Sequence, residues 1–573
     1  MNMIKNSRPQ YGPQLRLSEE IDTTKYRQDG EDFYSKVVRI ADALKDGPEH
    51  FEQFKDILRY MRFLPAGRVQ NAMGAARQTT AYNCFVSGVI EDSMESIMQR
   101  ATEAAETMRR GGGIGYDFSR IRPRGDLIKS LESRSSGPVS FMGIFDSICQ
   151  TIASSGHRRG AQMGVLRIDH PDIEQFITAK HNSSTLTGFN ISVGVTDEFM
   201  QHLNAKTPFP LRFEGRVYKE VDPVALWDAI MRSTWDWAEP GVLFIDRMNE
   251  MNNLNYIETI EASNPCAEQP LPPYGACLLG SFNLVKYVDM VKQEFAWDLF
   301  KDDIYVVVRA MDNVVDRTIY PLEEQQAEAK AKRRMGLGIT GLANAGEMLG
   351  KAYASEEFLS FMEQVMRDLR DTSYDASAEL AKEKGPFPFW EWEAYSSSKF
   401  IQTLPEDVKH KIMTTGIRNS HLLSIAPCGT ISLTGDNVSS GIEPPYALFY
   451  DRTIQGFDGQ SVERVEDYAY SLGIKGRTAN EITADEHVSV LALASQYVDS
   501  AVSKTCNVGD DVTYNEFKEL YYKAWVYGCK GITTFRAAGM RMGILNEAND
   551  NEPTEGKAEA CFIDPETGSK TCD

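Results

Sequence analysis

The segment 264–284 places the strongest restriction on how this chain can fold. It contains four prolines and two glycines among 21 residues, so regular helix or strand is not expected for most of it. It is also too apolar to be a solvated loop. A buried irregular loop must satisfy its backbone through many specific contacts, and proteins tolerate such loops mainly where function requires them. We therefore expect this segment to be buried and to carry functional side chains.

Three alternating side chains in this segment have complementary chemistry. Asn264, Cys266 and Glu268 would share one face of an extended backbone. A carboxylate can move protons, an amide can donate to a developing oxyanion, and a thiol can act as nucleophile, ligand or radical. The alternative is a proline-rich core loop with an incidental cysteine, and composition alone does not decide between the two.

One segment rich in hydroxyl side chains and three clusters of arginine and glycine have the composition of phosphate-binding loops. Residues 424–435 are rich in small and hydroxyl side chains, which suits a cradle of backbone N–H groups and hydroxyls. The Gly-Lys-Ser/Thr of a P-loop is absent there. Arginine and glycine cluster at 109–115, 120–125 and 157–164, and arginine forks bind phosphate well. Taken alone, a plain turn and solvated surface charge are the simpler interpretations.

The overall composition excludes several classes of protein. There are 61 basic and 82 acidic side chains, a net charge of -21, which opposes a nucleic-acid partner. The sequence contains no run of about 18 apolar residues, so no membrane span is expected. The first residues lack the apolar core of a secretory signal. The nine cysteines are therefore expected in a reducing, cytoplasmic compartment rather than in structural disulfides. No C-x-x-C pair occurs, so no metal site is predicted.

Helical signals alternate with short buried strands along the chain. Residues 94–108 have helical spacing, with Asp92 expected as the N-cap. Residues 224–237 and 304–315 also predict helices, and 242–245 predicts a buried strand. This alternation over several hundred residues favours an α/β architecture.

The composition also indicates how the chain is divided. It is even from about residue 30 to about residue 545, which favours one large domain over several small ones. We expect an N-terminal arm with helices at 1–60 and a catalytic domain at 61–545. The last residues, 546–573, are acidic and poor in large apolar groups, which predicts a mobile tail.

Several motifs occur together in the order found in one enzyme family. The most specific is Asn-Pro-Cys-x-Glu-Gln-Pro at 264–270, with a second cysteine eleven positions after the first. The other matching segments are 63–68, 83–84, 111–115, 136–142, 158–164, 426–444 and 528–533. Together they resemble the large, catalytic subunit of ribonucleotide reductases, most closely the adenosylcobalamin-dependent class II enzymes. The resemblance implies a ten-stranded α/β barrel with the cysteine loop as a finger through its centre.

The resemblance implies a role for each residue of the central loop. Cys266 resembles the cysteine that becomes a thiyl radical and abstracts the ribose 3′ hydrogen. Glu268 is similar to the base that takes the 3′-hydroxyl proton, and Asn264 to the amide that binds the substrate hydroxyls. Cys84 and Cys277 resemble the dithiol that reduces C2′ and becomes a disulfide. These five residues would supply the radical, the proton acceptor and the two electrons that ribose deoxygenation needs.

The resemblance also implies two nucleotide sites. The residues expected to bind the ribonucleotide substrate are Asn83, Cys428, Gly429, Thr430, Ile431 and Ser432. Relatives often have Thr or Ser at position 428, so backbone donors are expected to dominate there. The residues expected to bind a deoxynucleotide or ATP effector are Asp92, Ser93, Arg122, Lys129, Arg158 and Arg159. The sequence does not distinguish diphosphate from triphosphate substrates.

The radical source is implied by the resemblance alone. Class I enzymes receive the radical from a separate ferritin-like subunit through a Tyr-Tyr pair, and Thr533 and Thr534 occupy that place here. This favours adenosylcobalamin, with the separate subunit as the alternative. The pair Tyr521-Tyr522 just upstream is interpreted as helix packing.

The tail and the assembly complete the expectations. Cys561 and Cys572 resemble the tail pair that passes electrons from a thioredoxin- or glutaredoxin-type reductant to the active site. The family includes homodimers and monomers, so a homodimer is one candidate assembly. A nucleotide-binding protein without catalysis is the non-enzyme alternative. The joint presence of the five active-site residues disfavours it.

Overall fold

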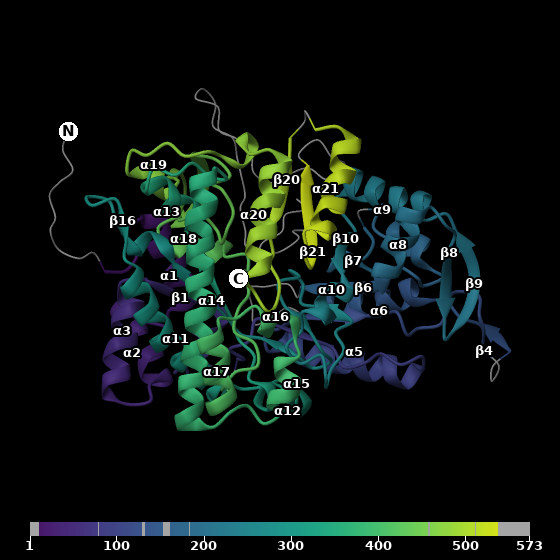
Figure 1. Cartoon of the computed structure of the whole chain (residues 1–573), viewed down its shortest axis with the longest axis horizontal. Coiled ribbons are helices and arrows are strands. Elements are labelled where there is room, and N and C mark those ends of the chain that lie inside the picture. The colour runs from purple at the N-terminus through teal and green to yellow at the C-terminus, as the bar shows by residue number, and fades with distance from the viewer. Residues whose placement is uncertain are drawn as a thin grey trace.

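The structure is a computed structural model that describes residues 11–77, 79–128, 132–152, 161–182, 184–456, 459–509 and 512–536 of the chain. Helices and strands alternate through this range, so the predicted α/β class is confirmed (Figure 1). Five of the predicted site residues lie outside the described residues: Lys129, Arg158, Arg159, Cys561 and Cys572. No helix within the described ranges is long and apolar enough to cross a membrane.

The larger sheet has eight strands in the order β13-β2-β3-β6-β7-β10-β21-β20. Five neighbouring strands are parallel: β2 (Cys84–Val86), β3 (Gly113–Asp117), β6 (Gln162–Arg167), β7 (Phe189–Val195) and β10 (Gly241–Phe244). The flanking strands are β13 (Ala276–Cys277), antiparallel to β2, and β21 (Gly531–Arg536), antiparallel to β10, with β20 (Thr505–Val508) parallel to β21. The predicted strand at 242–245 is thus confirmed as β10.

The smaller sheet has three strands, β1 (Phe63–Pro65), β14 (Leu279–Asn283) and β17 (Gly336–Thr340). Two isolated bridges, Leu337 to Leu423 and Ile425 to Val502, extend from β17 toward the segment that precedes β20. Among the described residues, the eight-stranded and three-stranded sheets are open and do not close a ten-stranded barrel. The reason is that the segment around Leu423 is joined to its neighbours by single bridges rather than by a ladder.

The predicted helices form, in part with different limits. They are α5 (Met94–Arg109), α9 (Pro223–Trp237) and α11 (Trp297–Arg317), the last longer than expected. The expected N-cap was wrong, because the Ser93 hydroxyl accepts the Ser96 N–H at 3.1 Å and caps α5. The Asp92 side chain instead pairs with Arg122.

Helices cover the sheets on several sides. The N-terminal helices α1 (Arg16–Tyr26), α2 (Phe33–Leu44) and α3 (Pro48–Arg59) form where a polar arm was expected to begin. Both α2 and α3 pack on α11 at one end of the molecule, whereas α8 (Asp197–Ala205) and α9 lie at the opposite end (Figure 1). The long α14 (Glu356–Lys384) packs on α11, α17 (Glu406–Thr415) and α20 (Ala484–Gln496).

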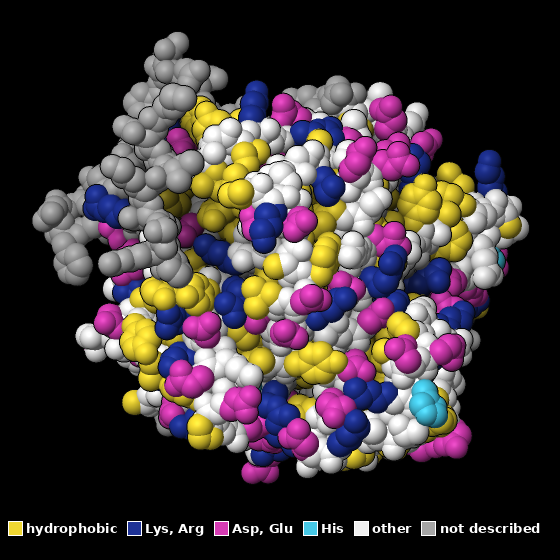
Figure 2. Space-filling model, turned by 60° about the vertical axis from the view of Figure 1, so that its left-hand side comes forward, with side chains coloured by type: hydrophobic (Ala, Val, Ile, Leu, Met, Phe, Trp, Pro, Cys, Tyr) yellow, Lys and Arg dark blue, Asp and Glu magenta, His cyan; other side chains and the backbone are white. Residues whose placement is uncertain are grey.

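Other helices and hairpins complete the described fold. Further helices are α18 (Gly429–Thr434), α13 (Leu342–Met348), α19 (Tyr468–Ser471), α10 (Ile245–Glu250) and α21 (Tyr514–Val526). Two-stranded hairpins include β11 (Ala262–Ser263) with β12 (Pro270–Leu271), β8 (Phe209–Phe213) with β9 (Arg216–Val221), and β18 (Phe449–Gly456) with β19 (Gly459–Glu466). On the face in Figure 2, acidic and basic side chains are interspersed.

Candidate active site

The central loop is a hairpin whose arms are β11 and β12. The Asn264 N–H donates to the Gln269 carbonyl at 3.1 Å, and the Ala267 N–H donates to the Asn264 carbonyl at 3.0 Å. Ala267 has a φ of 68°, in the left-handed region, where the chain reverses. The expectation of an extended backbone was therefore wrong. Asn264 and Glu268 meet because the loop folds back on itself.

Asn264 and Glu268 form a buried amide–carboxylate pair. Asn264 Nδ2 donates to Glu268 Oε1 at 2.7 Å, and Asn264 Oδ1 accepts the Gln269 N–H at 2.9 Å. The exposed fractions of Asn264 and Glu268 are 0% and 2%. The Glu268 backbone carbonyl accepts two further hydrogen bonds, from Ser424 Oγ and from the Ala501 N–H, both at 2.9 Å. The loop is thus held through both side chain and backbone.

Two glycines allow the loop to lie between the sheets. A Cβ at Gly115 on β3 would overlap the Ser263 carbonyl oxygen, and one at Gly336 on β17 would overlap the Gln269 amide. Glycine permits such close approach of one backbone to another chain segment. Asn190 Nδ2 on β7 also donates to the Pro265 carbonyl at 2.9 Å. The loop therefore contacts the larger sheet on one side and the smaller sheet on the other.

Cys84 and Cys277 face each other in register on β2 and β13. Both are free thiols. Burial raises the pKa of Cys84 to about 12, and the negative charge of Glu268 adds to the effect. Burial, Glu268 and the other thiol raise the pKa of Cys277 well above its ordinary value. Directly opposed residues on antiparallel strands lie about 4.5–5.5 Å apart between Cα atoms. A neutral dithiol within reach of disulfide formation results.

Cys266 lies at the turn of the same loop with an exposed fraction of 6%. Unlike Cys84 and Cys277, it is disulfide-bonded in the structure. A thiyl radical requires the free thiol, so this bond must be reduced before Cys266 can take the predicted role. Four of the five predicted active-site residues, Asn264, Glu268, Cys84 and Cys277, are thus brought together around the turn that carries the fifth.

The predicted phosphate loop forms the short helix α18. The Cys428 N–H donates to Ser440 Oγ at 3.0 Å, and its thiol contacts Ser281 Oγ at 3.1 Å. Ser432 Oγ donates to the Cys428 carbonyl at 2.6 Å, so this hydroxyl is turned back onto its own helix. The Thr430 hydroxyl is buried and has no hydrogen-bond partner among the described residues.

The start of α18 is open on the side that a Gly429 side chain would occupy. A Cβ at Gly429 would meet nothing within 4 Å, so the backbone faces open space there. Ile431 is buried against the N-terminal helices, with Tyr26 and Leu64. Asn83 is held at the larger sheet: its N–H donates to the Cys277 carbonyl at 3.2 Å and its carbonyl accepts the Gly113 N–H at 3.0 Å.

Comparison with known proteins decides the family. The family model described as the ribonucleotide reductase barrel domain matches residues 82–535. The vitamin B12-dependent ribonucleoside-diphosphate reductase of Mycobacterium tuberculosis (strain CDC 1551 / Oshkosh) is 35% identical over 528 residues, which cover 87% of this chain and 73% of the relative. The enzyme of the same name from Thermoplasma acidophilum is 35% identical over 546 residues, covering 88% of this chain and 68% of the relative. The chain belongs to the ribonucleotide reductase family.

A more distant relative extends the comparison. The vitamin B12-dependent ribonucleotide reductase of Streptomyces avermitilis is 27% identical over 627 residues, covering 93% of this chain and 64% of the relative. The resemblance inferred from the sequence motifs is therefore confirmed.

Thr533 and Thr534, which occupy the place where the Tyr-Tyr pair was expected, lie on β21. That strand reads Gly-Ile-Thr-Thr-Phe-Arg and has no tyrosine. Tyr521 on α21 is fully buried, and its hydroxyl lies 2.9 Å from Thr534 Oγ1. Tyr522 is partly exposed on the same helix. Helix packing therefore describes Tyr521 and not Tyr522.

Three residues of the effector site predicted for this reductase are described. Asp92 Oδ2 accepts from Arg122 Nε at 2.6 Å, and Asp92 Oδ1 accepts the Arg122 backbone N–H at 3.2 Å. Ser93 is adjacent, as the cap of α5. The structure thus brings Asp92, Ser93 and Arg122 together at a partly exposed position.

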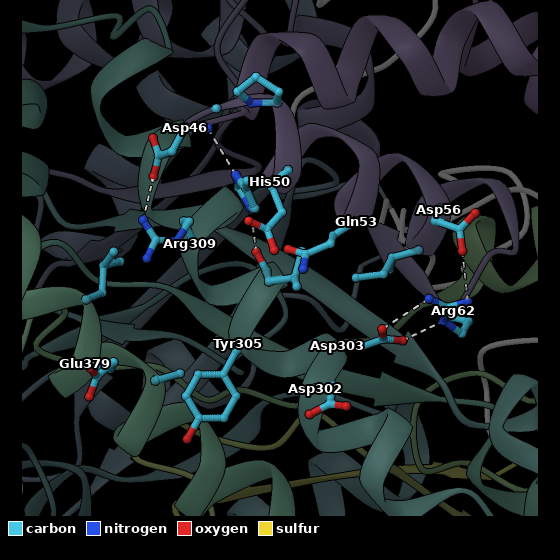
Figure 3. A pocket seen from close by; sticks show the side chains of 17 residues that line it. Asp46, His50, Gln53, Asp56, Arg62, Asp302, Asp303, Tyr305, Arg309 and Glu379 are labelled. Carbon is cyan, nitrogen blue, oxygen red and sulfur yellow. Dashed lines mark hydrogen bonds and ion pairs between the residues drawn. The ribbon is translucent and has the colours of Figure 1, made fainter.

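A surface pocket of about 720 Å³ lies elsewhere on the reductase, between α3, α11 and α14 (Figure 3). None of the predicted site residues lines it. Its arginines are already paired, Arg62 with Asp303 at 2.6 Å and Arg309 with Asp46 at 3.3 Å. These pairs leave the guanidinium groups engaged by the protein itself, so we assign no ligand to this pocket.

Sequence reasoning missed the residues that support the loop by donating to the Glu268 carbonyl. Ser424 lies in a segment singled out for phosphate binding, but its hydroxyl serves the Glu268 carbonyl instead. Ala501 contributes only a backbone N–H, for which no sequence signal exists. Both contacts join residues far apart in the chain.

Proposed function

We propose that the protein reduces ribonucleoside diphosphates to 2′-deoxyribonucleoside diphosphates by thiyl-radical chemistry in a vitamin B12-dependent reaction. The observation that carries the proposal is the free dithiol of Cys84 and Cys277, opposed in register beside the buried Asn264–Glu268 pair. Family membership and the names of the relatives at 35% identity support the same reaction and substrate.

The residues present supply each chemical requirement. Cys266, as a thiyl radical, removes the 3′ hydrogen atom, and Glu268 accepts the 3′-hydroxyl proton. The 2′ hydroxyl leaves as water. Cys84 and Cys277 supply two electrons and two protons and become a disulfide. Glu268 returns its proton to the 3′ oxygen and Cys266 returns the hydrogen atom to C3′, which gives deoxynucleotide, water and one disulfide per turnover.

Asn264 positions the Glu268 carboxylate and the substrate hydroxyls in this scheme. Its amide donates to Glu268 and so fixes the acceptor carboxylate, while its backbone closes the hairpin turn. The substrate hydroxyls would replace or share this amide hydrogen bond. Because the thiols of Cys84 and Cys277 have raised pKa values, they enter the reaction as neutral hydrogen-bearing groups.

Adenosylcobalamin is the proposed radical source. When bound, it supplies an organic radical by homolysis of its cobalt–carbon bond. Position 533–534 on β21 fits this choice, because threonines stand where a radical relay from another subunit would need tyrosines. The alternative, a separate ferritin-like subunit, lacks that relay here. The chain's own contribution is Cys266 on a loop held rigidly between two sheets.

The finer assignments form part of the same proposal. The substrate phosphates bind at Cys428 to Ser432, with Asn83 near the dithiol, and a deoxynucleotide or ATP effector binds near Asp92 and Arg122. Cys561 and Cys572 relay electrons from a thioredoxin- or glutaredoxin-type protein in the cytoplasm. Residues 61–545 form the catalytic domain, and strands from its eight-stranded and three-stranded sheets belong to a ten-stranded barrel, an inference supported by the bridges at Leu423 and Ile425. A homodimer is the proposed assembly.

The deciding experiment is anaerobic incubation of the full chain with adenosylcobalamin, a ribonucleoside diphosphate and a dithiol. We expect cob(II)alamin in the electron paramagnetic resonance spectrum and deoxynucleotide in the products. Cys266→Ser should give neither product nor consumption of the dithiol. Product formed only after addition of a separate metal-containing subunit would reject the B12-dependent proposal, and full activity of Cys266→Ser would reject the radical assignment.

The relay and the effector site are tested separately. A double variant, Cys561→Ser with Cys572→Ser, should fail with thioredoxin but complete one turnover when pre-reduced. Asp92→Asn should alter the response of substrate choice to deoxynucleotides while leaving the basal reaction in place. Full turnover with thioredoxin in the double variant would contradict the relay.

A further inference from the structure

Lys530 is a buried cation with no role in the scheme above. It directly precedes β21 and has an exposed fraction of 4%. Its ammonium donates to three consecutive backbone carbonyls: Asp499 at 2.6 Å, Ser500, and Val498 at 3.5 Å. An ammonium has three hydrogens and no acceptor, so these carbonyls replace the water that it loses on burial.

The carbonyls that Lys530 binds belong to the segment that holds the catalytic loop. Ala501, the next residue, donates its N–H to the Glu268 carbonyl at 2.9 Å. Ser424 Oγ lies between the same two residues: it donates to the Glu268 carbonyl at 2.9 Å and lies 3.4 Å from the Ala501 carbonyl. Lys530 is therefore two hydrogen-bonded steps from the backbone of Glu268.

Asp499 binds the second segment that supports the catalytic loop, residues 422–424, to the segment that Lys530 binds. Its carboxylate accepts the Leu422 N–H at 2.7 Å and the Leu423 N–H at 3.0 Å, and also the Tyr374 hydroxyl at 2.7 Å. Leu422 and Leu423 lead directly into Ser424. The carboxylate of Asp499 and the ammonium of Lys530 thus restrain the two segments whose donors converge on Glu268.

We infer that Lys530 is a positioning residue for Glu268: its ammonium gathers the 498–500 carbonyls and so fixes the Ala501 and Ser424 donors that hold the catalytic loop. The inference deepens the proposed function and rests on it. Displacement of a catalytic group by about 1 Å can cost roughly 100-fold in rate, so a support this close to the base has kinetic consequences.

The charge of Lys530 provides a readout that a purely structural role would not have. Three ionisable side chains face it: Asp499, Arg247 and His421. Burial lowers the pKa of Lys530 to about 8, with Asp499 opposing and Arg247 adding to the shift. His421 has its pKa lowered well below its usual value, and Cys84 has its pKa raised to about 12, so neither titrates near pH 8.

The test compares kcat, KM and pH dependence in the full-length enzyme with adenosylcobalamin. In the wild type, kcat should fall as pH rises through about 8, because the neutral amine binds the carbonyls more weakly. Lys530→Arg keeps its charge at high pH and should lose this fall. Lys530→Met should lower kcat by roughly 10- to 100-fold with little change in the KM for nucleotide.

Lys36→Met is the matched control. Lys36 has the same exposed fraction, 4%, but its ammonium binds Asp22 and the Gln70 side chain (3.1 Å) among the N-terminal helices. This variant should lower the melting temperature while kcat and its pH dependence stay those of the wild type.

The outcomes separate the inference from the proposed function. A wild type without B12-dependent reduction would defeat the proposed function before any variant is made. An active wild type whose kcat is flat from pH 7 to pH 9.5, or a folded Lys530→Met with wild-type kcat, would overturn the role of Lys530. If neither Lys530 variant folds, the wild-type pH profile decides: the fall near pH 8 supports the inference and its absence rejects it.

Discussion

Two regions of the molecule hold a buried carboxylate with an asparagine amide, and they differ in their neighbours. In the catalytic loop, Asn264 donates to Glu268 at 2.7 Å beside the thiols of Cys84 and Cys277. Where α13 meets α19, the Asn344 amide instead serves two carboxylates, Asp467 at 2.9 Å and Glu347 at 3.4 Å.

The two carboxylates of the second region, Glu347 and Asp467, repel each other electrostatically. Burial raises the pKa of Glu347 to about 8, and the nearby Asp467 charge adds to the effect. Burial likewise raises the pKa of Asp467 to about 6. An amide–carboxylate pair alone therefore does not make an active site. The chemistry comes from what the tertiary structure sets beside the pair, thiols in one case and a second carboxylate in the other.

The largest expected difference between the regions is in catalysis. Glu268→Gln keeps the shape and the contact with Asn264 but removes the proton acceptor, so kcat should fall by about 10²- to 10⁴-fold. Glu347→Gln is the matched change in the second region and should leave kcat within a few-fold of the wild type. Steady-state kinetics on both variants check this, and equal losses would erase the distinction between the two regions.

Removal of each asparagine amide should affect catalysis in the first region and stability in the second. Asn264→Ala removes the amide that donates to Glu268 and the acceptor of the Gln269 N–H, so kcat should fall about 10- to 100-fold through misplacement of the base. Asn344→Ala leaves buried acceptors unpaired and should cost about 1–3 kcal/mol of unfolding free energy. Chemical denaturation and kcat measured side by side separate the effects, and the expectation fails if Asn344→Ala loses more activity than Asn264→Ala.

The packing of the loop between the sheets is expected to affect the stability of the protein rather than catalysis. Gly115→Ala would drive a methyl group into the Ser263 carbonyl and should destabilise the protein by about 1–3 kcal/mol. Gly429→Ala meets open space and should be nearly neutral, which makes it the control. Thermal melts of the two variants decide, with similar melting temperatures contradicting the close packing of the loop.

The second region should also make the stability of the protein depend on pH. The pKa of Glu347 is about 8 in the folded protein and near 4.3 when unfolded. The folded state therefore binds more protons between these values, and its stability falls as pH rises through this window. The slope should approach about 1.4 kcal/mol per pH unit at most and should disappear in Glu347→Gln. Denaturation at pH 5, 6, 7 and 8 measures it, and an unchanged slope in the variant would refute the assignment.

Motif spacing predicted a set of active-site residues that the structure brings together, but it misjudged how they meet. The alternation of Asn264, Cys266 and Glu268 predicted a shared extended face, whereas the left-handed Ala267 turns the chain and brings the first and last together. The same limit applies at α5. Asp92 was expected to cap the helix, but a stronger partner, Arg122, lies 30 residues further along the chain, and Ser93 takes the cap.

The sequence alone determined the set of reactive groups, because amide, thiol and carboxylate side chains carry their chemistry wherever they stand. It also determined the alternation of helix and strand, since hydrophobic periodicity is local. The tertiary structure decided that Cys84 faces Cys277, that glycines on two sheets admit the loop, and that Ser424, Ala501 and Lys530 support Glu268. These contacts join segments distant in the chain, so they follow from how the sheets pack and not from the spacing of residues along it.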